Sequence, residues 1–289
     1  MKKLTLLTLF ISLISQAWCQ NYYRLYDRVL TFNQSGLINS GAVTSNTHDS
    51  LSDNQSAAQK NSVCHNGVFY HVYNNSGISG DADIYLRTST DGINWTAVPI
   101  QVNDDSANAT QNFPSLIVLD SASVTKVVVM WNDYRLGVSN AQVRIAVSTN
   151  GGNTFAPSVQ ISNHINNLTE VIGNIAVDEG GNIYACWYEG TGFSGNNTWM
   201  SKSFDGGYTW QPMITIFTGS QYSFPCMLVA RHSGEVMAIV SDDQFQKKNL
   251  IAVTSSDSGN TWSNHQFTFY TQFQEVPEFP AAFVDTAGI

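Results

Sequence analysis

Short segments in which apolar and polar residues alternate recur from about residue 57 to the end of the chain. Alternation with a period of two places one face of a strand against a core, so these segments are predicted to be β-strands. One set of predicted strands comprises 113–119, 126–132, 143–148 and a fourth segment that ends at Ile161. No stretch shows the spacing of an amphipathic helix. The pattern therefore predicts an all-β protein.

The predicted strands come in groups of four, and such groups at a steady period are typical of β-propeller blades. We expect a β-propeller of four-stranded blades. A six-bladed ring would need roughly one hundred further residues, so four blades and one strand of it are expected here. A four-bladed ring with a short tail is the alternative. The expected organisation is a signal peptide at 1–20, an N-terminal strand and polar segment at 21–56, a propeller at 57–289, blades at about 57–102, 113–162, 171–217 and 224–270, and the start of a further blade at 279–289.

One short stretch occurs four times, and its clearest copy, Ser203 to Trp210, reads Ser-Phe-Asp-Gly-Gly-Tyr-Thr-Trp. The acidic or amide positions of successive copies are 59, 55 and 52 residues apart. A period near 50 indicates a repeat architecture. The residues that define the copies are Ser89, Asp91 and Trp95; Ser148, Asn150, Gly152 and Phe155; Ser203, Asp205, Gly207 and Trp210; and Ser255, Asp257, Gly259 and Trp262.

The residue types of this stretch suit a hairpin turn, because each copy lies between two predicted strands. The Asp or Asn side chain can accept hydrogen bonds from the backbone N–H groups that follow it. Glycine supplies the positive φ that a tight turn requires. A large aromatic residue just after a turn usually anchors it to a core. The repeated stretch is therefore interpreted as scaffold and not as catalytic machinery.

Composition narrows the class of protein. The 289 residues are 43% hydrophobic, which is enough for a sizeable core, and only 12% are charged. The formal net charge is −9, so nothing indicates a nucleic-acid partner, which requires a basic patch. Cys64, Cys186 and Cys226 are irregularly spaced, and no zinc pattern or disulfide framework is evident. No metal and no cofactor are expected.

The first residues resemble a targeting segment. Lys2 and Lys3 precede an apolar run from Leu4 to Ile14, and a plausible cleavage region follows. The run is too short to span a bilayer comfortably, so no transmembrane span is expected. Lipidation at Cys19 is the alternative reading. The mature chain is expected to be secreted, or to lie at the cell surface or in the periplasm.

The order of the strands predicts where a ligand site would lie. In a four-stranded meander, the first and third turns share one end of the blade, and the second turn shares the other end with the connection to the next blade. The repeated stretch is always the third turn, so the longer polar loops occupy the opposite end, where ligand sites are favoured. The acidic residues expected at that end are Asp81, Asp83, Asp104, Asp105, Asp133, Glu170, Glu189, Asp242, Asp243, Glu275 and Glu278.

Three of these acidic residues are the candidate catalytic residues. Asp133, Glu189 and Asp242 occupy equivalent places just after the second strand of successive blades. Carboxylates arranged around the mouth of a channel can hold a sugar, bind a cation or act as an acid/base pair. The alternative for each residue is an ordinary solvated loop.

Neighbouring aromatic and charged residues are the candidates for binding a substrate. Trp131, Tyr134 and Tyr188 lie near the end of the second predicted strand, and sugars stack on aromatic faces. Arg135 and Asp243 lie in the same loops. Packing in a core beside the channel is the alternative for the aromatic residues.

The repeated turn resembles the Asp-box, or bacterial neuraminidase repeat, of sialidases and sialidase-like β-propellers. The resemblance covers residues 57–289, and the segment from Trp131 to Arg135 also looks like part of secreted sialidase-like proteins. It implies a propeller that binds or hydrolyses extracellular glycans or glycoproteins, with an exo-sialidase-type glycoside hydrolase as the candidate enzyme. A non-catalytic secreted propeller that binds a glycan or a protein is the alternative.

The chain departs from the sialidase pattern in its arginines. Known sialidases use three arginines, a tyrosine paired with a glutamate, and an aspartate, and their first arginine usually lies in an Arg-Ile-Pro motif. That motif is absent here, and Arg24 and Arg28 lie in a sequence that does not match it. The family's tyrosine and last arginine would fall in later blades.

Overall fold

The computed structural model describes residues 61–76, 82–105, 109–121, 123–137, 140–163, 169–191, 194–219, 223–231, 234–244 and 247–267. Within these residues, sixteen strands form four antiparallel sheets. The first two sheets comprise β1 (Ser62–His65), β2 (Val68–Ser76), β3 (Ala82–Ser89) and β4 (Ile100–Gln101), and then β5 (Gln111–Ser121), β6 (Val124–Asp133), β7 (Gln142–Ser148) and β8 (Val159–Gln160). The other two comprise β9 (Thr169–Val177), β10 (Ile183–Thr191), β11 (Ser194–Ser203) and β12 (Ile214–Thr218), and then β13 (Ser223–Ala230), β14 (Val236–Gln244), β15 (Lys247–Ser255) and β16 (Ser263–Phe267).

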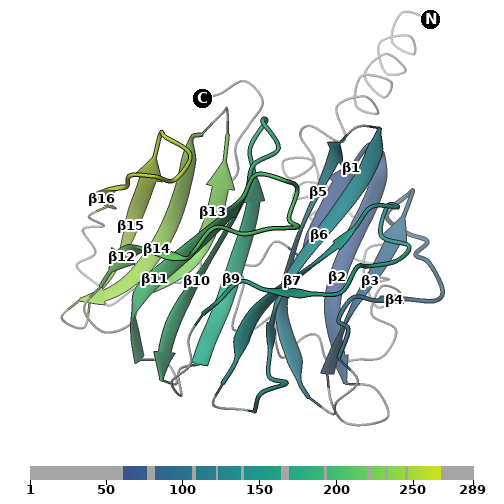
Figure 1. Cartoon of the computed structure of the whole chain (residues 1–289), viewed down its shortest axis with the longest axis horizontal. Helices are drawn as coiled ribbons and strands as arrows, with labels where there is room; N and C mark the ends of the chain where they lie inside the picture. The colour runs from purple at the N-terminus through teal and green to yellow at the C-terminus, as the bar shows by residue number, and fades with distance from the viewer. Residues whose placement is uncertain are drawn as a thin grey trace, which may run out of the picture.

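The four sheets lie side by side in chain order, from purple to yellow in Figure 1. Each strand pairs with the next one in the sequence, as in a meander. The first strands of neighbouring sheets, β1, β5, β9 and β13, contact one another, so the first strand of each blade is the inner one. The predicted all-β class and four-stranded blades are confirmed.

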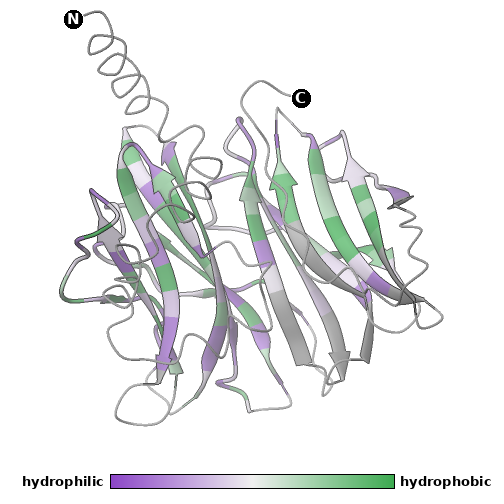
Figure 2. Cartoon of the chain, turned by 180° about the vertical axis from the view of Figure 1, so that it is seen from behind, coloured by the Kyte–Doolittle hydropathy of each residue, from purple (hydrophilic) through white to green (hydrophobic). Residues whose placement is uncertain are grey.

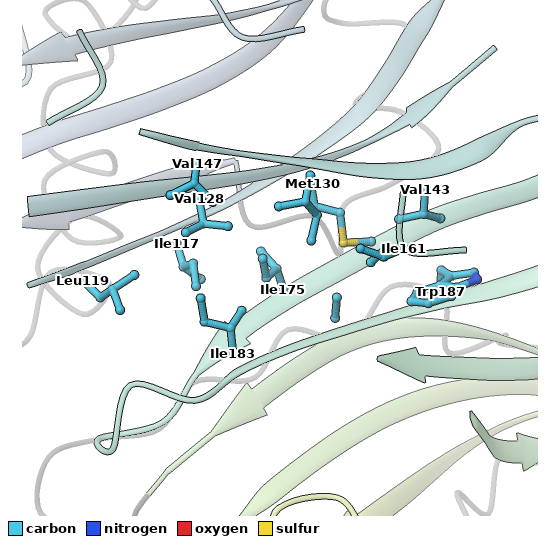
Figure 3. Close-up of a cluster of buried hydrophobic side chains, with 12 residues drawn as sticks. Ile117, Leu119, Val128, Met130, Val143, Val147, Ile161, Ile175, Ile183 and Trp187 are labelled. Carbon is cyan, nitrogen blue, oxygen red and sulfur yellow. The ribbon is translucent and has the colours of Figure 1, made fainter. Parts of the chain in front are cut away.

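The core lies between successive sheets, because alternate residues of each strand face the two neighbouring blades. In β6, Val129 and Trp131 pack towards the first sheet, whereas Val128 and Met130 pack towards the third. Figure 2 shows hydrophobic and hydrophilic stretches along the strands of the sheets. The cluster between the second and third sheets, which includes Met130 and Trp187, appears in Figure 3. Each large side chain buried in this way contributes about 1.5–3 kcal/mol.

The inner strands of the second to fourth sheets carry a bulge at a similar height. The register of β5 against β6 shifts between Asn112 and Ser115, opposite Trp131. The register of β9 shifts opposite Trp187, and that of β13 shifts just after Pro225. A bulge bends the strand and redirects the residues beside it. Each inner strand is therefore turned at the end where its blade receives the chain from the previous one.

The repeated turns connect the third and fourth strands of every blade, as the sequence predicted. In the third copy, the Ser203 hydroxyl donates to Asp205 at 2.8 Å and accepts from the Gly207 N–H at 2.9 Å. Asp205 also accepts from the N–H and the hydroxyl of Thr209 at 3.0 and 2.6 Å. Partial burial acts to raise the pKa of Asp205, but these hydrogen bonds prevail and lower it to about 2. The turn therefore holds its carboxylate ionised.

The aromatic residue that ends each full-length turn packs between two blades. Trp210 lies against the core between the second and third sheets, and Trp262 lies against the core between the third and fourth. Phe155 does the same between the first and second sheets. The turn therefore anchors its own blade to the preceding one, as expected of a scaffold element.

The sheets span 62–101, 111–160, 169–218 and 223–267, close to the expected blade limits. The expected signal peptide, the segment at 21–56 and the start of a further blade at 279–289 lie outside the described residues. Among the residues that are described, no helix is long and apolar enough to cross a membrane. Six blades in the complete ring stays a prediction.

Candidate functional site

The blades have two ends that differ in their connections. The turn end carries the repeated turns. The loop end is where β2, β6, β10 and β14 finish and where β5, β9 and β13 begin.

The register of the strands places the three candidate catalytic residues at equivalent positions of the loop end. The first serine of the repeated turn pairs with Val127, Ile183 and Val236 in successive blades, and Asp133, Glu189 and Asp242 each lie six residues further on. The expectation that they follow the second strand was wrong, because β6 ends at Asp133 and both β10 and β14 continue past their acidic residue. Extended pairing with the third strand keeps these residues within the sheet.

Asp133 is completely buried, and both of its oxygens have partners. The Trp131 indole donates to Oδ2 at 3.0 Å. The Arg135 guanidinium donates to Oδ1 and Oδ2 at 2.8 Å each, and the Arg135 backbone N–H donates to Oδ1 at 3.0 Å. This two-pronged geometry is the strong form of the arginine–carboxylate pair. Asp133 therefore orients Arg135 and Trp131.

Arg135 continues this network to the connection between the first two blades. Its guanidinium donates to Asp104 at 2.8 Å, and Asp104 also accepts from the Ser158 N–H at 2.8 Å and the Ser158 hydroxyl at 2.7 Å. Burial acts to raise the pKa of Asp104, but Arg135 and Ser158 outweigh it and lower the value to about 2. The two carboxylates, Asp133 first, raise the pKa of Arg135. The guanidinium is thus held within the protein.

The other acidic candidates lie in β10 and β14, the second strands of the third and fourth blades. Asp242 is 4% exposed at the end of β14, opposite Ser223 on one side and Asn249 on the other. The backbones of Glu189 and Asp243 lie in β10 and β14, but their side chains fall outside what the structure describes.

Two tyrosines from neighbouring blades lie close together at the loop end. Burial raises the pKa of Tyr134 and outweighs the opposing effect of the neighbouring Asn112 and Asn132 side chains. Tyr188 is 3% exposed, and burial, followed by the neighbouring Tyr134, raises its pKa to about 12. Both phenols remain protonated at neutral pH and can donate a hydrogen bond.

Trp131, predicted to bind a substrate, lies in the core. Its side chain is completely buried between the first and second sheets. This is the packed position that the sequence left open as the alternative. Its indole N–H donates to Asp133, so Trp131 positions the Asp133 carboxylate from within the core.

Asn103 joins two further carboxylates at the same end. Its Nδ2 lies 2.7 Å from Asp83 Oδ1, 2.7 Å from Asp105 Oδ1 and 3.2 Å from Gln111 Oε1. The two carboxylate oxygens are therefore at most twice 2.7 Å apart. An amide nitrogen has two hydrogens for these three acceptors. The sequence placed Asp83 and Asp105 at this end but not beside each other, because only the pairing of β3 with β4 brings Asn103 next to Ile84.

Buried polar atoms that make no hydrogen bond within the protein gather at the loop end. Buried side-chain polar atoms are normally paired, so each one normally meets a water or a ligand. They include Asp105 Oδ2, Gln111 Nε2, Asn112 Oδ1, Trp187 Nε1, Thr198 Oγ1 and Ser241 Oγ. Donors and acceptors are mixed, which suits a partner with hydroxyl groups.

His, Cys, Asp and Glu are the side chains in the described part of the chain that could ligate a metal ion. No group of three or more His, Cys, Asp or Glu residues is arranged there to hold an ion. Cys186 is completely buried and packs in the core between the third and fourth sheets. It serves as a small apolar residue of that core.

Comparisons with known proteins bear on the fold. A scan against protein-family models found no match, and a search of curated proteins found none. Among solved structures, a polysaccharide lyase of family PL25, an ulvan lyase, matches with a TM-score of 0.52 at 11% identity over 71% of this chain and 54% of that one. The exo-β-1,3-galactanase 1,3Gal43A from Clostridium thermocellum matches with a TM-score of 0.51 at 15% identity over 73% of this chain and 48% of that one.

A sialidase from Trypanosoma rangeli also matches, with a TM-score of 0.48 at 16% identity over 70% of this chain and 37% of that one, but the fold assignment does not depend on it. The chain spans about half the length of the solved structures that it matches first. Together with the four-stranded sheets in chain order, the first two matches support a β-propeller fold with four-stranded blades. At such low identity the likeness extends to the fold alone.

Proposed function

We propose that this protein is an extracellular β-propeller that binds a glycan at the loop end of its blades. The observation that supports this most directly is the group of buried polar atoms at that end, which mixes donors such as Gln111 Nε2 with acceptors such as Asp105 Oδ2. Sugar hydroxyls both donate and accept, so a sugar can pair with both kinds. The tyrosines Tyr134 and Tyr188 add two phenolic donors.

The arginines favour a neutral glycan over sialic acid at this site. A sialic acid clamp needs guanidinium groups that are open to the carboxylate of the sugar. Arg135 is engaged by Asp133 and Asp104, and Arg144 donates to Ser158 and Gln142. Exo-sialidase activity would therefore depend on arginines other than these two.

Removing single hydroxyl groups tests the binding site. Tyr134→Phe and Tyr188→Phe should each weaken binding to a neutral oligosaccharide panel about fivefold to tenfold, because a lost hydrogen bond costs about 1 kcal/mol. The matched control is Tyr184→Phe, in the same strand as Tyr188, because the Tyr184 hydroxyl donates to Asp178 at the turn end. Glycan-array titration reads out binding. Unchanged affinity in both loop-end variants would refute this placement.

Hydrolysis is the second candidate function, and the pair of Asp83 and Asp105 favours it. The Oδ1 atoms of Asp83 and Asp105 are at most twice 2.7 Å apart. This limit is compatible with the separation of about 5–5.5 Å between the two carboxyl groups of retaining glycoside hydrolases. Asp133 is then a positioning residue, and Glu189 and Asp242 are the candidates for the acid/base role if Asp83 and Asp105 are not the catalytic pair.

The pair is tested on a panel of chromogenic glycosides. Asp105→Asn should lower kcat at least a hundredfold if the pair is catalytic, and the product should keep its anomeric configuration. Glu235→Gln, at the turn end, is the control and should keep full activity. If the wild-type protein binds glycans without cleaving any of them, the protein is a binding module and hydrolysis is excluded.

A further inference from the structure

The turn end of the third blade exposes two aromatic side chains. Phe204 is 54% exposed and Tyr208 is 46% exposed, and both belong to the repeated turn between β11 and β12. Trp210, from the same turn, is instead packed against the core. Single exposed apolar residues are normal on a protein surface. Two exposed aromatic rings in one turn instead leave a local patch of apolar surface in water.

The other copies of the turn show that the scaffold does not need these rings. The second position of the turn is Thr90, Thr149 and Ser256 in the other three blades. The sixth position is Asn153 and Asn260 in the other full-length copies. Those copies form the same serine and carboxylate or amide hydrogen bonds as the third copy. Phe204 and Tyr208 are therefore an addition to the turn and not a requirement of it.

Two lysines accompany the exposed rings. The Lys126 Nζ lies 5.0 Å from the centroid of the Tyr208 ring, and the Lys202 Nζ lies 5.4 Å from the centroid of the Phe204 ring. The Lys202 ammonium donates to Ser258 O and Asn260 Oδ1, which are uncharged acceptors, and it has a third proton to donate. The ion pairs found in the described residues involve only arginine and histidine as cations.

The two lysines belong to a chain with a net charge of −9 and 13 lysines and arginines in 289 residues, and the charge of Asp257 also acts on Lys202. Asp205 lies in the same turn, but its oxygens accept from Ser203, Tyr208 and Thr209. Hydrogen bonds from the turn thus already stabilise its charge. Neither ammonium group forms an ion pair among the described residues, so each can pair with the charge of an anionic ligand.

We propose that Lys126, Tyr208, Phe204 and Lys202 form a second glycan-binding surface, and that it takes an acidic polysaccharide. The apolar face of a sugar ring stacks on an exposed aromatic ring, and a carboxylate or sulfate of the same chain pairs with an ammonium group. The residues come from β6, β11 and the turn of the third blade, so the surface crosses from the second blade to the third. It lies at the end of the blades opposite the proposed loop-end site and does not depend on it.

Affinity electrophoresis of the full chain tests this surface. The gels contain carboxymethylated β-1,3-glucan, sulfated dextran or unmodified β-1,3-glucan. The double variant Phe204→Thr/Tyr208→Asn carries residues that the chain itself uses at these positions, so it should fold normally. It should raise the Kd for an acidic polysaccharide at least tenfold with Tm unchanged. The control is Ile93→Asn, which removes a side chain that is 68% exposed in the turn of the first blade, and it should bind as the wild type does.

Charge is tested separately from stacking. Lys126→Met keeps the apolar stem of the side chain and should raise the Kd about threefold or more, and added salt should weaken the binding of the wild type. Wild-type protein that is not retarded by either acidic polysaccharide would overturn the proposal, as would equal retardation by the neutral glucan. Tyr188→Phe should leave this binding intact, so failure of the loop-end site and failure of this surface are distinguishable.

Discussion

At the residue scale, partners rather than residue type decide what each acidic side chain does. Asp133 and Asp105 lie at the same end of the blades. Arg135 and Trp131 occupy both oxygens of Asp133, whereas Asp105 keeps a buried oxygen that no protein group pairs with. The first arrangement holds the protein together. The second is equipped to meet a ligand.

Asp133→Asn should lower the free energy of unfolding by about 3–5 kcal/mol, because it breaks a buried ion pair and leaves Arg135 poorly compensated. The control is Asp120→Asn, whose carboxylate is 47% exposed and pairs with His65, and it should cost far less because an exposed pair is screened by solvent. Urea unfolding measures both. An equal loss of unfolding free energy in both variants would mean that the buried ion pair stabilises the protein no more than the exposed one.

The ion pair of Asp104 predicts a dependence of stability on pH. Its pKa is lowered from 3.8 to about 2 in the folded protein. The carboxylate therefore adds stability that is present above about pH 4 and is lost as the pH falls towards 2. Asp104→Asn should destabilise the protein at pH 7 and much less at pH 2. A cost that is the same at both values, measured from urea midpoints, would contradict this assignment.

At the element scale, the repeated turn works by combining backbone conformation with close packing. Gly151 and Gly152 both have positive φ values, +69° and +88°. A Cβ on Gly151 would meet open space, whereas a Cβ on Gly152 would overlap Leu86 of the first blade. The turn therefore needs its second glycine for contact with the neighbouring blade as well as for its conformation.

The two glycines make a matched pair of variants. Gly151→Ala should cost about 1 kcal/mol from the backbone alone. Gly152→Ala should cost about 1–3 kcal/mol more, because Leu86 must move out of the core. Thermal unfolding of both variants gives the difference. A smaller effect at Gly152 than at Gly151 would show that blade contact plays no part.

At the scale of the whole molecule, each blade is completed by its neighbours. All three core clusters combine residues from two successive sheets, and the turn-end aromatic residues reach into the same seams. Further links cross the seams, such as Lys202 to Asn260 and the Gly234 N–H to Asp178. The described blades are therefore expected to unfold together.

Trp187→Ala should destabilise the protein by about 3–5 kcal/mol, since it empties space between the second and third sheets. Fluorescence and circular dichroism should still report one shared transition. Ile214→Ala, at a residue that is 38% exposed in β12, serves as the control and should cost far less. Separate transitions for the two probes in the wild type would show that the blades are independent.

Much of the fold could be predicted from the sequence because its signals are local. The apolar run along β6 and the turn chemistry at Ser203 to Trp210 each involve a few consecutive residues. The predicted end of the second strand was wrong at Asp133, Glu189 and Asp242, because polar residues at those positions look like loop. Hydrogen bonding to the third strand extends the sheet regardless of their polarity.

The candidate site was harder to predict. The sequence predicted that Asp83, Asp105 and Asp133 lie at one end of the blades, because strand order alone decides the end. It carried no signal that Arg135 would occupy Asp133 or that Asn103 would join Asp83 to Asp105, because those contacts depend on side chains that are 2 to 31 residues apart in the chain.

The sequence by itself determined the strands, the blade period and the two ends of the blades, since periodicity and turn residues act over short range. Only the tertiary structure decided which polar groups at the loop end are paired and which are not. It also decided which aromatic residues are buried, with Trp131 in the core and Phe204 and Tyr208 in solvent. Burial and pairing depend on packing between blades, and neighbouring blades contribute residues that lie far apart in the chain.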